Sequence, residues 1–248
     1  MGAAHARLWR AGARWRLTEA RAPVRPADAA TLILLDHSGK APRVLMGRRH
    51  AGHKFMPGKF VFPGGRLEPS DRRMAIAGPL DELIEEKLNA RARRASQHLG
   101  RALALAALRE TFEETGLAIG ARDCGAPENP PDGVWARFAA TGVFPALDGL
   151  DFLARAITPP GRTKRFDTRF LVADAASIAY HEEGAVHAEA ELVELVWIEL
   201  AKTATLDLPE ITRVVLKDLT IALAGGMSRF RPRPFYHQMR GQWLREEL

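Results

Sequence analysis

The sequence contains little cysteine and no long apolar segment. Of its 248 residues only Cys124 is a cysteine, which excludes an internal disulfide framework and fits a reducing compartment. No apolar run approaches the roughly 18 residues that a membrane span requires, and no secretory signal segment precedes the globular part. Hydrophobic residues nevertheless make up 46% of the chain, which is ample for a packed core. We therefore predict a cytoplasmic globular protein without a membrane partner.

The charge pattern lacks the features of a nucleic-acid-binding protein. The formal net charge is +6, which favours an anionic partner, but no basic run is interleaved with aromatic residues as single-strand binding requires. Arginine is instead spread along the whole chain. We predict no nucleic-acid partner, and the charge is compatible with a phosphorylated small-molecule substrate.

No internal repeat or linker-like change in composition divides the chain. We predict one domain over residues 1–248, with a basic N-terminal arm at 1–25 and a C-terminal tail at 227–248 whose aromatic residues dock onto the domain. The arm holds six arginines against one acid, Glu19, but no serine, so it matches a transit peptide only in part. The sequence is also compatible with a homodimer.

Hydrophobic periodicity and turn residues predict alternating strands and helices. Strands are expected at 31–35, 43–49, 60–62, 152–158, 165–173 and 191–198. Helices are expected at 80–95, 99–115 and 134–140, and from Pro209 to the glycine pair 225–226. Gly116 directly follows the second helix, where glycine is typical of a C-cap. The order of elements indicates an α/β protein.

Three glutamates lie at positions i, i+3 and i+4 of the second helix. Glu110, Glu113 and Glu114 share one helix face at this spacing, and we expect their carboxylates to converge. A hard divalent cation is the natural partner of clustered carboxylates, and bound magnesium often contacts a substrate phosphate as well. A solvated acidic helix face is the alternative interpretation, and the spacing alone leaves it open.

A second pattern lies upstream, where Phe62-Pro63-Gly64-Gly65 is followed by Arg66-Leu67-Glu68-Pro69-Ser70-Asp71. Together with Arg109–Leu117 (RETFEETGL), it resembles the Nudix hydrolase box, G-x5-E-x7-R-E-U-x-E-E-x-G-U, where U is bulky and apolar. Asp71 stands where the family usually has glutamate, and Thr111 occupies a U position. The resemblance implies a Nudix-type α/β/α sandwich with a mixed β-sheet.

The two halves of the box are separated by an insertion. Residues 72–108 lie between Asp71 and Arg109, where the family pattern has seven residues, so about thirty extra residues, approximately 72–101, form a helical insertion. The insertion leaves open whether Asp71 or Glu68 plays the part of the first acid. A split box resembles the peroxisomal-type coenzyme A diphosphatase branch of the family.

The resemblance implies a metal-dependent hydrolysis of the diphosphate bond in a nucleoside diphosphate linked to another group, with coenzyme A or acyl-coenzyme A favoured. Alternatives are an ADP-ribose, NADH or dinucleoside polyphosphate pyrophosphatase and a non-catalytic Nudix-fold binding module. Mg²⁺ or Mn²⁺ would neutralise the diphosphate and activate water. The metal ligands implied by the family are Gly65, Glu110, Glu113 and Glu114, and Arg109 would orient the carboxylates.

Residues outside the box supply further candidates. Glu191 is the expected additional catalytic residue, with Glu182, Glu183 and Glu189 as other candidates for the general base. Arg165 and Arg169 alternate with apolar residues along one strand, and we expect their charged face to line the substrate cleft. Phosphate contacts are also expected from the basic residues around the second strand, which are Arg48, Arg49 and Lys54.

Overall fold

A computed structural model describes residues 24–53, 56–92, 96 and 98–248 of the chain. The basic arm predicted at 1–25 therefore lies almost entirely outside the described residues. None of the helices among the described residues combines the length and apolar character that a membrane crossing requires.

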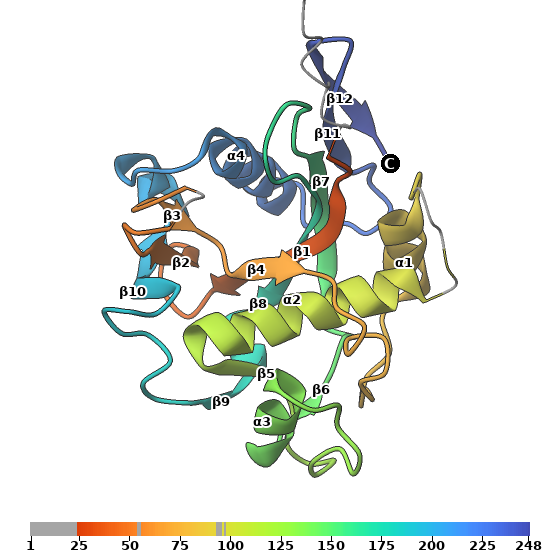
Figure 1. Cartoon of the computed structure of the whole chain (residues 1–248), viewed down its shortest axis with the longest axis vertical. Helices are drawn as coiled ribbons and strands as arrows, with labels where there is room; N and C mark the ends of the chain where they lie inside the picture. Colours follow the sequence, from red (N-terminus) through yellow and green to blue (C-terminus); the bar gives the residue numbers. More distant parts are fainter. Residues whose placement is uncertain (1–23, 54–55, 93–95, 97) are drawn as a thin grey trace, which may run out of the picture.

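The described residues form alternating strands and helices (Figure 1). The helices are α1 (Glu82–Asn89), α2 (Leu99–Thr115), α3 (Val134–Ala140) and α4 (Glu210–Ala224). The strands of the main sheet are β1 (Ala27–Asp36), β2 (Arg43–Arg49), β3 (Phe60–Val61), β4 (Gly64–Arg66), β7 (Asp151–Ile157), β8 (Phe166–Asp174), β10 (Leu192–Glu199), β11 (Pro234–Met239) and β12 (Gln242–Glu247). A smaller sheet contains β5 (Leu117–Ala121), β6 (Phe144–Pro145) and β9 (Ile178–His181).

The main sheet is mixed and has β1 near its centre. Its strand order is β10-β2-β1-β8-β7-β11-β12, with β3 paired to β2 and β4 paired to β1. Strand β1 runs parallel to β8 over its length and antiparallel to β2 and β4. The continuous apolar run at 31–35 predicts a strand that is buried on both faces, and this is its environment in the structure.

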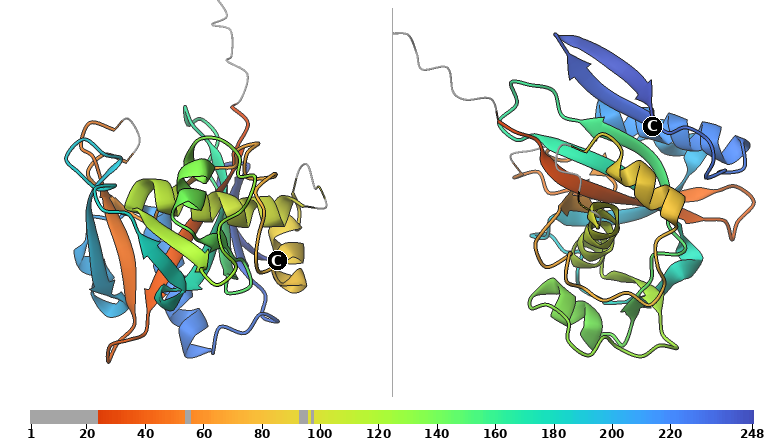
Figure 2. Two further views of the ribbon diagram at one scale, coloured as in Figure 1. Left: turned by 90° about the horizontal axis from the view of Figure 1, so that it is seen from below. Right: turned by 90° about the vertical axis from the view of Figure 1, so that its right-hand side faces the viewer.

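Helices cover both faces of this sheet, which gives the α/β/α arrangement that the resemblance implies. On one face Leu32 and Leu34 of β1 pack in a core with α1 and α2. On the other face Ile33 and Leu35 pack against Val215 and neighbouring residues of α4. Figure 2 shows α4 on the side of the sheet opposite to α2 and α3.

The sheet forks between β1 and β2, and this fork positions the candidate site. The two strands pair only at Leu35↔Val44 and Asp36↔Arg43, near the β1–β2 turn. Beyond this point they diverge, because β3 pairs with β2 and β4 pairs with β1. The short β3–β4 segment thus fills the gap and brings the Pro-Gly-Gly turn beside α2.

The insertion forms α1, which caps the helix that carries the three glutamates. The Asn89 side-chain oxygen accepts a hydrogen bond from Gly100 N at 2.8 Å, and Glu85 Oε1 accepts one from Arg101 N at 3.2 Å. His98, the residue before α2, makes no capping bond with its own side chain. Two first-turn amides of α2 are therefore satisfied by side chains of the inserted helix.

Several predicted boundaries shift in the structure. The first expected helix, at 80–95, ends with Asn89, and residues 93–95 lie outside the described part of the chain. The other expected helices and strands agree with the observed bounds within a few residues. The C-terminal tail does more than dock its aromatic residues, because it adds the hairpin β11–β12 to the edge of the sheet next to β7.

Candidate active site

The acidic end of α2 packs closely against the glycine pair of β4. The carboxyl atoms of Glu110 lie only 2.3–2.6 Å from where a Cβ on Gly65 would stand. Gly64 N donates a hydrogen bond to Glu114 Oε2 at 3.1 Å. Glycine is needed at this contact because any side chain on Gly65 would overlap the glutamate.

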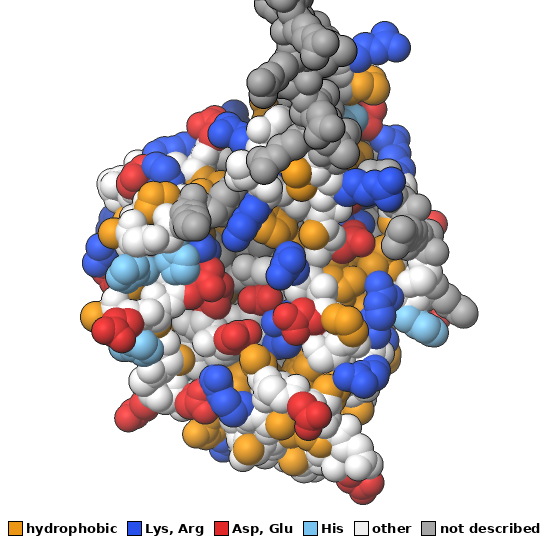
Figure 3. All heavy atoms as spheres, in the orientation of Figure 1, with side chains coloured by type: hydrophobic (Ala, Val, Ile, Leu, Met, Phe, Trp, Pro, Cys, Tyr) orange, Lys and Arg blue, Asp and Glu red, His pale blue; other side chains and the backbone are white. Residues whose placement is uncertain are grey.

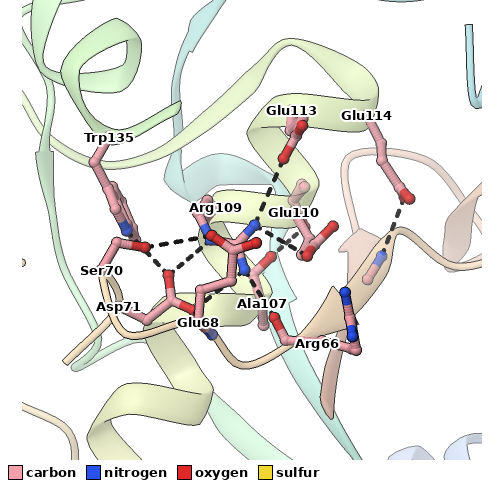
Figure 4. Close-up of polar contacts among 12 residues, drawn as sticks. Arg66, Glu68, Ser70, Asp71, Ala107, Arg109, Glu110, Glu113, Glu114 and Trp135 are labelled. Atoms are coloured by element: carbon pink, nitrogen blue, oxygen red, sulfur yellow. Dashed lines mark hydrogen bonds and ion pairs between the residues drawn. The ribbon is translucent and has the colours of Figure 1, made fainter. Parts of the chain in front are cut away.

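Arg109 connects the two halves of the split motif through a buried ion pair with Asp71 (Figure 4). Its Nε and Nη2 donate to the two Asp71 oxygens at 2.7 and 3.2 Å, and Nη2 also donates to the Arg66 carbonyl oxygen at 2.8 Å. Trp135 Nε1 and the Glu68 backbone amide complete the shell of Asp71 at 3.0 and 2.8 Å. The Asp71 side chain is fully buried, whereas Glu68 is exposed.

This arrangement assigns the first acid of the motif by geometry. Asp71, and not Glu68, pairs with Arg109. Burial opposes the charge on Arg109, but the hydrogen bonds that it donates to Asp71 and the charge of Glu110 raise its pKa above the usual value. The guanidinium is therefore permanently charged and holds Glu110 through a 3.0 Å contact between Nη1 and Oε1.

Glu114 is buried and Glu110 is half-buried, with too little positive charge around either carboxylate to offset the burial. Burial raises the pKa of Glu110 to about 7, and the charges of Glu113 and Glu191 act in the same direction against Arg109. Burial also raises the pKa of Glu114 well above its usual range, assisted by the charges of Glu191 and Glu110. Hard oxygen donors in this state fit a divalent cation, which would lower both pKa values.

The three carboxylates share one end of α2 but do not meet at one point. Glu110 and Glu113 both turn toward Arg109 Nη1, at 3.0 and 3.5 Å, while Glu114 turns toward Gly64 N (Figure 4). Within the described residues, no group of three or more acidic, histidine or cysteine side chains is arranged to hold a metal ion. Arg109 and Gly64 hold the carboxylates in different directions here, and their expected role as metal ligands stays a prediction.

Two cavities meet at the acidic end of α2. The acidic cavity, of about 610 Å³, is lined by Arg66, Glu68, Arg109, Glu110, Glu113, Glu114, Arg137, Glu182, Gly184, Ala185, His187, Ala190 and Glu191. The apolar cavity, of about 320 Å³, shares four of these residues, Arg66, Glu110, Glu114 and Glu191. Its other lining residues are Ala29, Thr31, Arg49, Met56, Val61, Phe62, Gly64, Gly65, Lys164, Phe166, Thr168, Phe170, Ile211 and Thr212.

Figure 3 shows this face of the molecule. Acidic side chains gather over one half of α2, and Lys and Arg side chains lie directly above them. A divalent cation and an anionic ligand could therefore be held side by side. When bound, the cation would neutralise the ligand's phosphates and lower the pKa of a bound water.

The candidates for the general base occupy different positions. Glu191 borders both cavities and pairs with Arg49, with 2.9 Å between Oε1 and Nη1. Glu182 borders the acidic cavity but pairs with Arg137 at 2.8 Å. Glu183 and Glu189 line neither cavity. Of these four glutamates, only Glu191 lines both cavities, as Glu110 and Glu114 do.

The basic residues expected around β2 are partly used in ion pairs. Arg48 lines neither cavity and pairs with Glu194 of β10 at 2.6 Å. Arg49 lines the apolar cavity while it holds Glu191. Lys54 lies outside the described residues. Of the two described residues, Arg48 and Arg49, only Arg49 is therefore placed at the candidate site.

The face of β8 that lines the apolar cavity is opposite to the face that the sequence pattern predicted. Phe166, Thr168 and Phe170 border the apolar cavity, whereas Arg165 and Arg169 border neither cavity. Arg169 is fully buried and pairs with Asp28 and Asp167 at 2.7 and 3.2 Å. Neither arginine is therefore placed for the expected substrate contacts, because Arg169 is on the side of β8 that faces the core covered by α1 and α2, and Arg165 lies outside both cavities.

Arg165 and Arg169 instead contribute to the structure. Arg165 donates to the carbonyl oxygens of Thr158 and Val24, both at 2.9 Å. Asp167, which accepts a hydrogen bond from Arg169, also forms a bidentate ion pair with Arg155 of β7. Nε and Nη2 of Arg155 each donate to one Asp167 carboxylate oxygen at 2.7 Å. Arg155 in turn donates to the Ala90 carbonyl oxygen at 2.6 Å, at the end of the inserted helix.

The cavities also contain residues that the sequence patterns did not single out. Arg66 and Lys164 bring cations to the apolar cavity, and Ile211 brings α4 to its wall. Arg66 follows the glycine pair of the motif directly, so its position offered a signal. Lys164 lies in a loop between two strands, where periodicity gives no information.

Comparisons with known proteins agree with this fold. The structure is similar to a Nudix hydrolase from Alicyclobacillus acidocaldarius at 28% sequence identity and a TM-score of 0.59, covering 81% of this chain and 96% of that one. It is less similar to the M. smegmatis Nudix hydrolase RenU, at 17% identity and a TM-score of 0.44, covering 80% and 86%. No family model and no curated protein matches the chain.

The motif halves, although split by α1, meet through Arg109 and Asp71. The α/β/α fold, the reassembled motif and the similarity to the Alicyclobacillus protein assign this chain to the Nudix hydrolase superfamily.

Proposed function

We propose that this Nudix pyrophosphohydrolase cleaves the diphosphate bond of coenzyme A or an acyl-coenzyme A. Nudix hydrolases in general act on pyrophosphate bonds and use divalent metal ions. The observation that carries the proposal is the pair of joined cavities. An acidic compartment around Glu110 and Glu114 opens into an apolar compartment with its own cations.

The chemistry follows from how the residues are held. Glu110, Glu113, Glu114 and the Gly65 region are the proposed holders of Mg²⁺ or Mn²⁺. Arg109 is a positioning residue, since Asp71 fixes its guanidinium and the guanidinium fixes Glu110. Such positioning, together with charge stabilisation, accounts for most of the catalysis in phosphoryl transfer.

Glu191 is the proposed general base. Its carboxylate lies at the junction of the two cavities, and Arg49 holds its orientation. A carboxylate at this position can accept the proton of the attacking water. A Glu191→Gln variant should retain substrate binding but lose about 10²–10⁴-fold in kcat, the usual contribution of a general base. Glu199→Gln, at the far end of β10, is the matched control and should keep its activity.

The substrate assignment is tested with a panel. Purified protein with Mg²⁺ or Mn²⁺ is offered coenzyme A, acetyl-coenzyme A, ADP-ribose, NADH and diadenosine polyphosphates, and the products are separated by chromatography. Release of adenosine 3′,5′-bisphosphate supports the proposal. Preferential release of AMP from ADP-ribose would replace coenzyme A with that substrate, and no turnover of any compound would indicate a binding module.

The metal assignment has its own test. Glu113→Gln and Glu114→Gln are compared with the parent protein for turnover and for Mn²⁺ binding. We expect both variants to bind Mn²⁺ more weakly and to turn over slowly, because each loses a charged oxygen donor. Full turnover in both variants would contradict the assignment.

A further inference from the structure

Two cations of the apolar cavity are not used by the protein itself. Arg66 lies at the end of β4, and Lys164 lies in the loop that precedes β8; both line the apolar cavity. Among the residues that the structure describes, neither side chain makes a hydrogen bond or an ion pair. In Figure 4 the Arg66 guanidinium lies below Glu110 without a contact to any residue drawn there.

This lack of partners distinguishes them from their basic neighbours. Arg49 pairs with Glu191, Arg109 with Asp71, and Arg137 with Glu182. Arg66 is surrounded by acidic residues of the adjoining cavity and still forms no ion pair with them. A cation left unpaired at the edge of a ligand cavity is available to an anionic ligand.

The two cations occupy different parts of the site. Arg66 borders both cavities and therefore lies at their junction, beside Glu110 and Glu114. Lys164 borders only the apolar cavity, together with Phe166 of the same segment, and is absent from the acidic one. A ligand with a phosphate at each position must therefore extend from the acidic end into the apolar cavity.

The two side chains also suit different phosphates. A guanidinium can contact two oxygens of a phosphate at once, which suits the diphosphate that is cleaved. A lysine ammonium acts as a flexible point charge and suits a single phosphate monoester. The apolar walls between them would accommodate the uncharged ring system that connects the two groups.

We propose that Arg66 and Lys164 divide anion recognition between them. Arg66 binds the diphosphate next to the carboxylates, and Lys164 binds a second phosphate that is attached to the nucleoside outside the diphosphate bridge. Lys164 thereby selects nucleoside diphosphate derivatives that carry an additional phosphate monoester. The inference rests on the proposed function and assigns residues to the recognition of its substrate.

Steady-state kinetics with matched substrates separate the two roles. Coenzyme A and dephospho-coenzyme A share the diphosphate bond and differ only in the 3′-phosphate. Lys164→Gln should lower kcat/KM for coenzyme A about tenfold, mainly through KM, and leave dephospho-coenzyme A unchanged, as expected for the loss of one charge-assisted hydrogen bond. Arg66→Gln should lower kcat/KM for both substrates by similar factors.

Two control variants test whether the charge and the position of Lys164 cause the preference for coenzyme A. Lys164→Arg should retain most of the preference for coenzyme A, and Lys40→Gln, in the β1–β2 turn, should behave like the parent protein. An equal loss for both substrates in Lys164→Gln, or no loss for either, would overturn the proposal.

A binding experiment keeps this inference separate from the proposed function. Calorimetry with adenosine 3′,5′-bisphosphate and with AMP measures recognition of the second phosphate without turnover. The parent protein should bind the bisphosphate more tightly than AMP, and Lys164→Gln should reduce that ratio about tenfold. If coenzyme A is not hydrolysed but this ratio falls, only the proposed substrate is wrong. If the ratio is unchanged, Lys164 does not select the phosphate.

Discussion

Replacing Asp71 by asparagine should strongly destabilise the protein. Four donors point at the Asp71 carboxylate: Nε and Nη2 of Arg109, Nε1 of Trp135 and the Glu68 amide. Asparagine offers one oxygen and an NH₂ group, so two of these donors would face another donor. Arg109, which is 2% exposed, would also lose its fully buried counter-charge.

The expected magnitude follows from this geometry. Removing one partner of a buried ion pair costs about 3–5 kcal/mol, a large part of the roughly 5–15 kcal/mol that stabilises a folded domain. The slope of unfolding free energy against urea increases with protein size and should be about 3 kcal/mol per molar for this chain, so the midpoint should drop by about 1–2 M. Activity should fall as well, because Arg109 would no longer hold Glu110 in place.

Urea unfolding followed by circular dichroism provides the measurement. Glu68→Gln is the matched control: its side chain is exposed, and the change should stay within about 0.5 kcal/mol. A double variant, Asp71→Leu with Arg109→Met, should recover much of the stability but none of the activity, since an apolar pair can replace a buried ion pair structurally. A loss below about 1 kcal/mol for Asp71→Asn, or an equal loss for Glu68→Gln, would refute the reasoning.

Three further predictions concern the metal, the glycine contact and the inserted helix. Because the pKa of Glu110 is raised from 4.5 to about 7, the metal-free protein should lose up to about 3 kcal/mol of stability as the pH rises through this interval. The thermal shift caused by Mg²⁺ should thus be larger at pH 8 than at pH 5.5, and an equal shift would contradict this. Gly65→Ala should abolish activity and cost about 1–3 kcal/mol through overpacking against the glutamate, while Gly149→Ala, with open space around it, should be neutral in thermal unfolding and turnover. Asn89→Ala should cost about 1 kcal/mol and increase amide exchange in the first turn of α2, whereas Glu86→Gln, on the exposed side of α1, should change neither measurement.

The strongest local patterns predicted the fold well. The apolar run of β1 requires burial on both faces, and the structure buries it between α2 and α4. Gly116 ends α2 in the left-handed conformation, with φ 76°, as its position after the last glutamate indicates. Such features depend on neighbours within a few residues, and the chain therefore specifies them locally.

The split motif could be recognised from the sequence for the same reason. The contact between its two halves could not be predicted in this way. Asp71 and Glu68 were both acceptable as the first acid, since both follow the glycine pair at short distance. Only the packing of Trp135 and Arg109 around one of them resolves this choice. The partners come from segments 38 and 64 residues away, and no local pattern links them.

The sequence by itself determined that Glu110, Glu113 and Glu114 share a helix face and that the residues of β8 alternate between two faces, because both follow from backbone periodicity. Tertiary structure decided which face meets the cavity. Phe166 and Thr168 line it, while Arg169 pairs with Asp28 in the opposite core. Periodicity relates residues to one another within an element, but the side that faces a ligand depends on which elements pack against it.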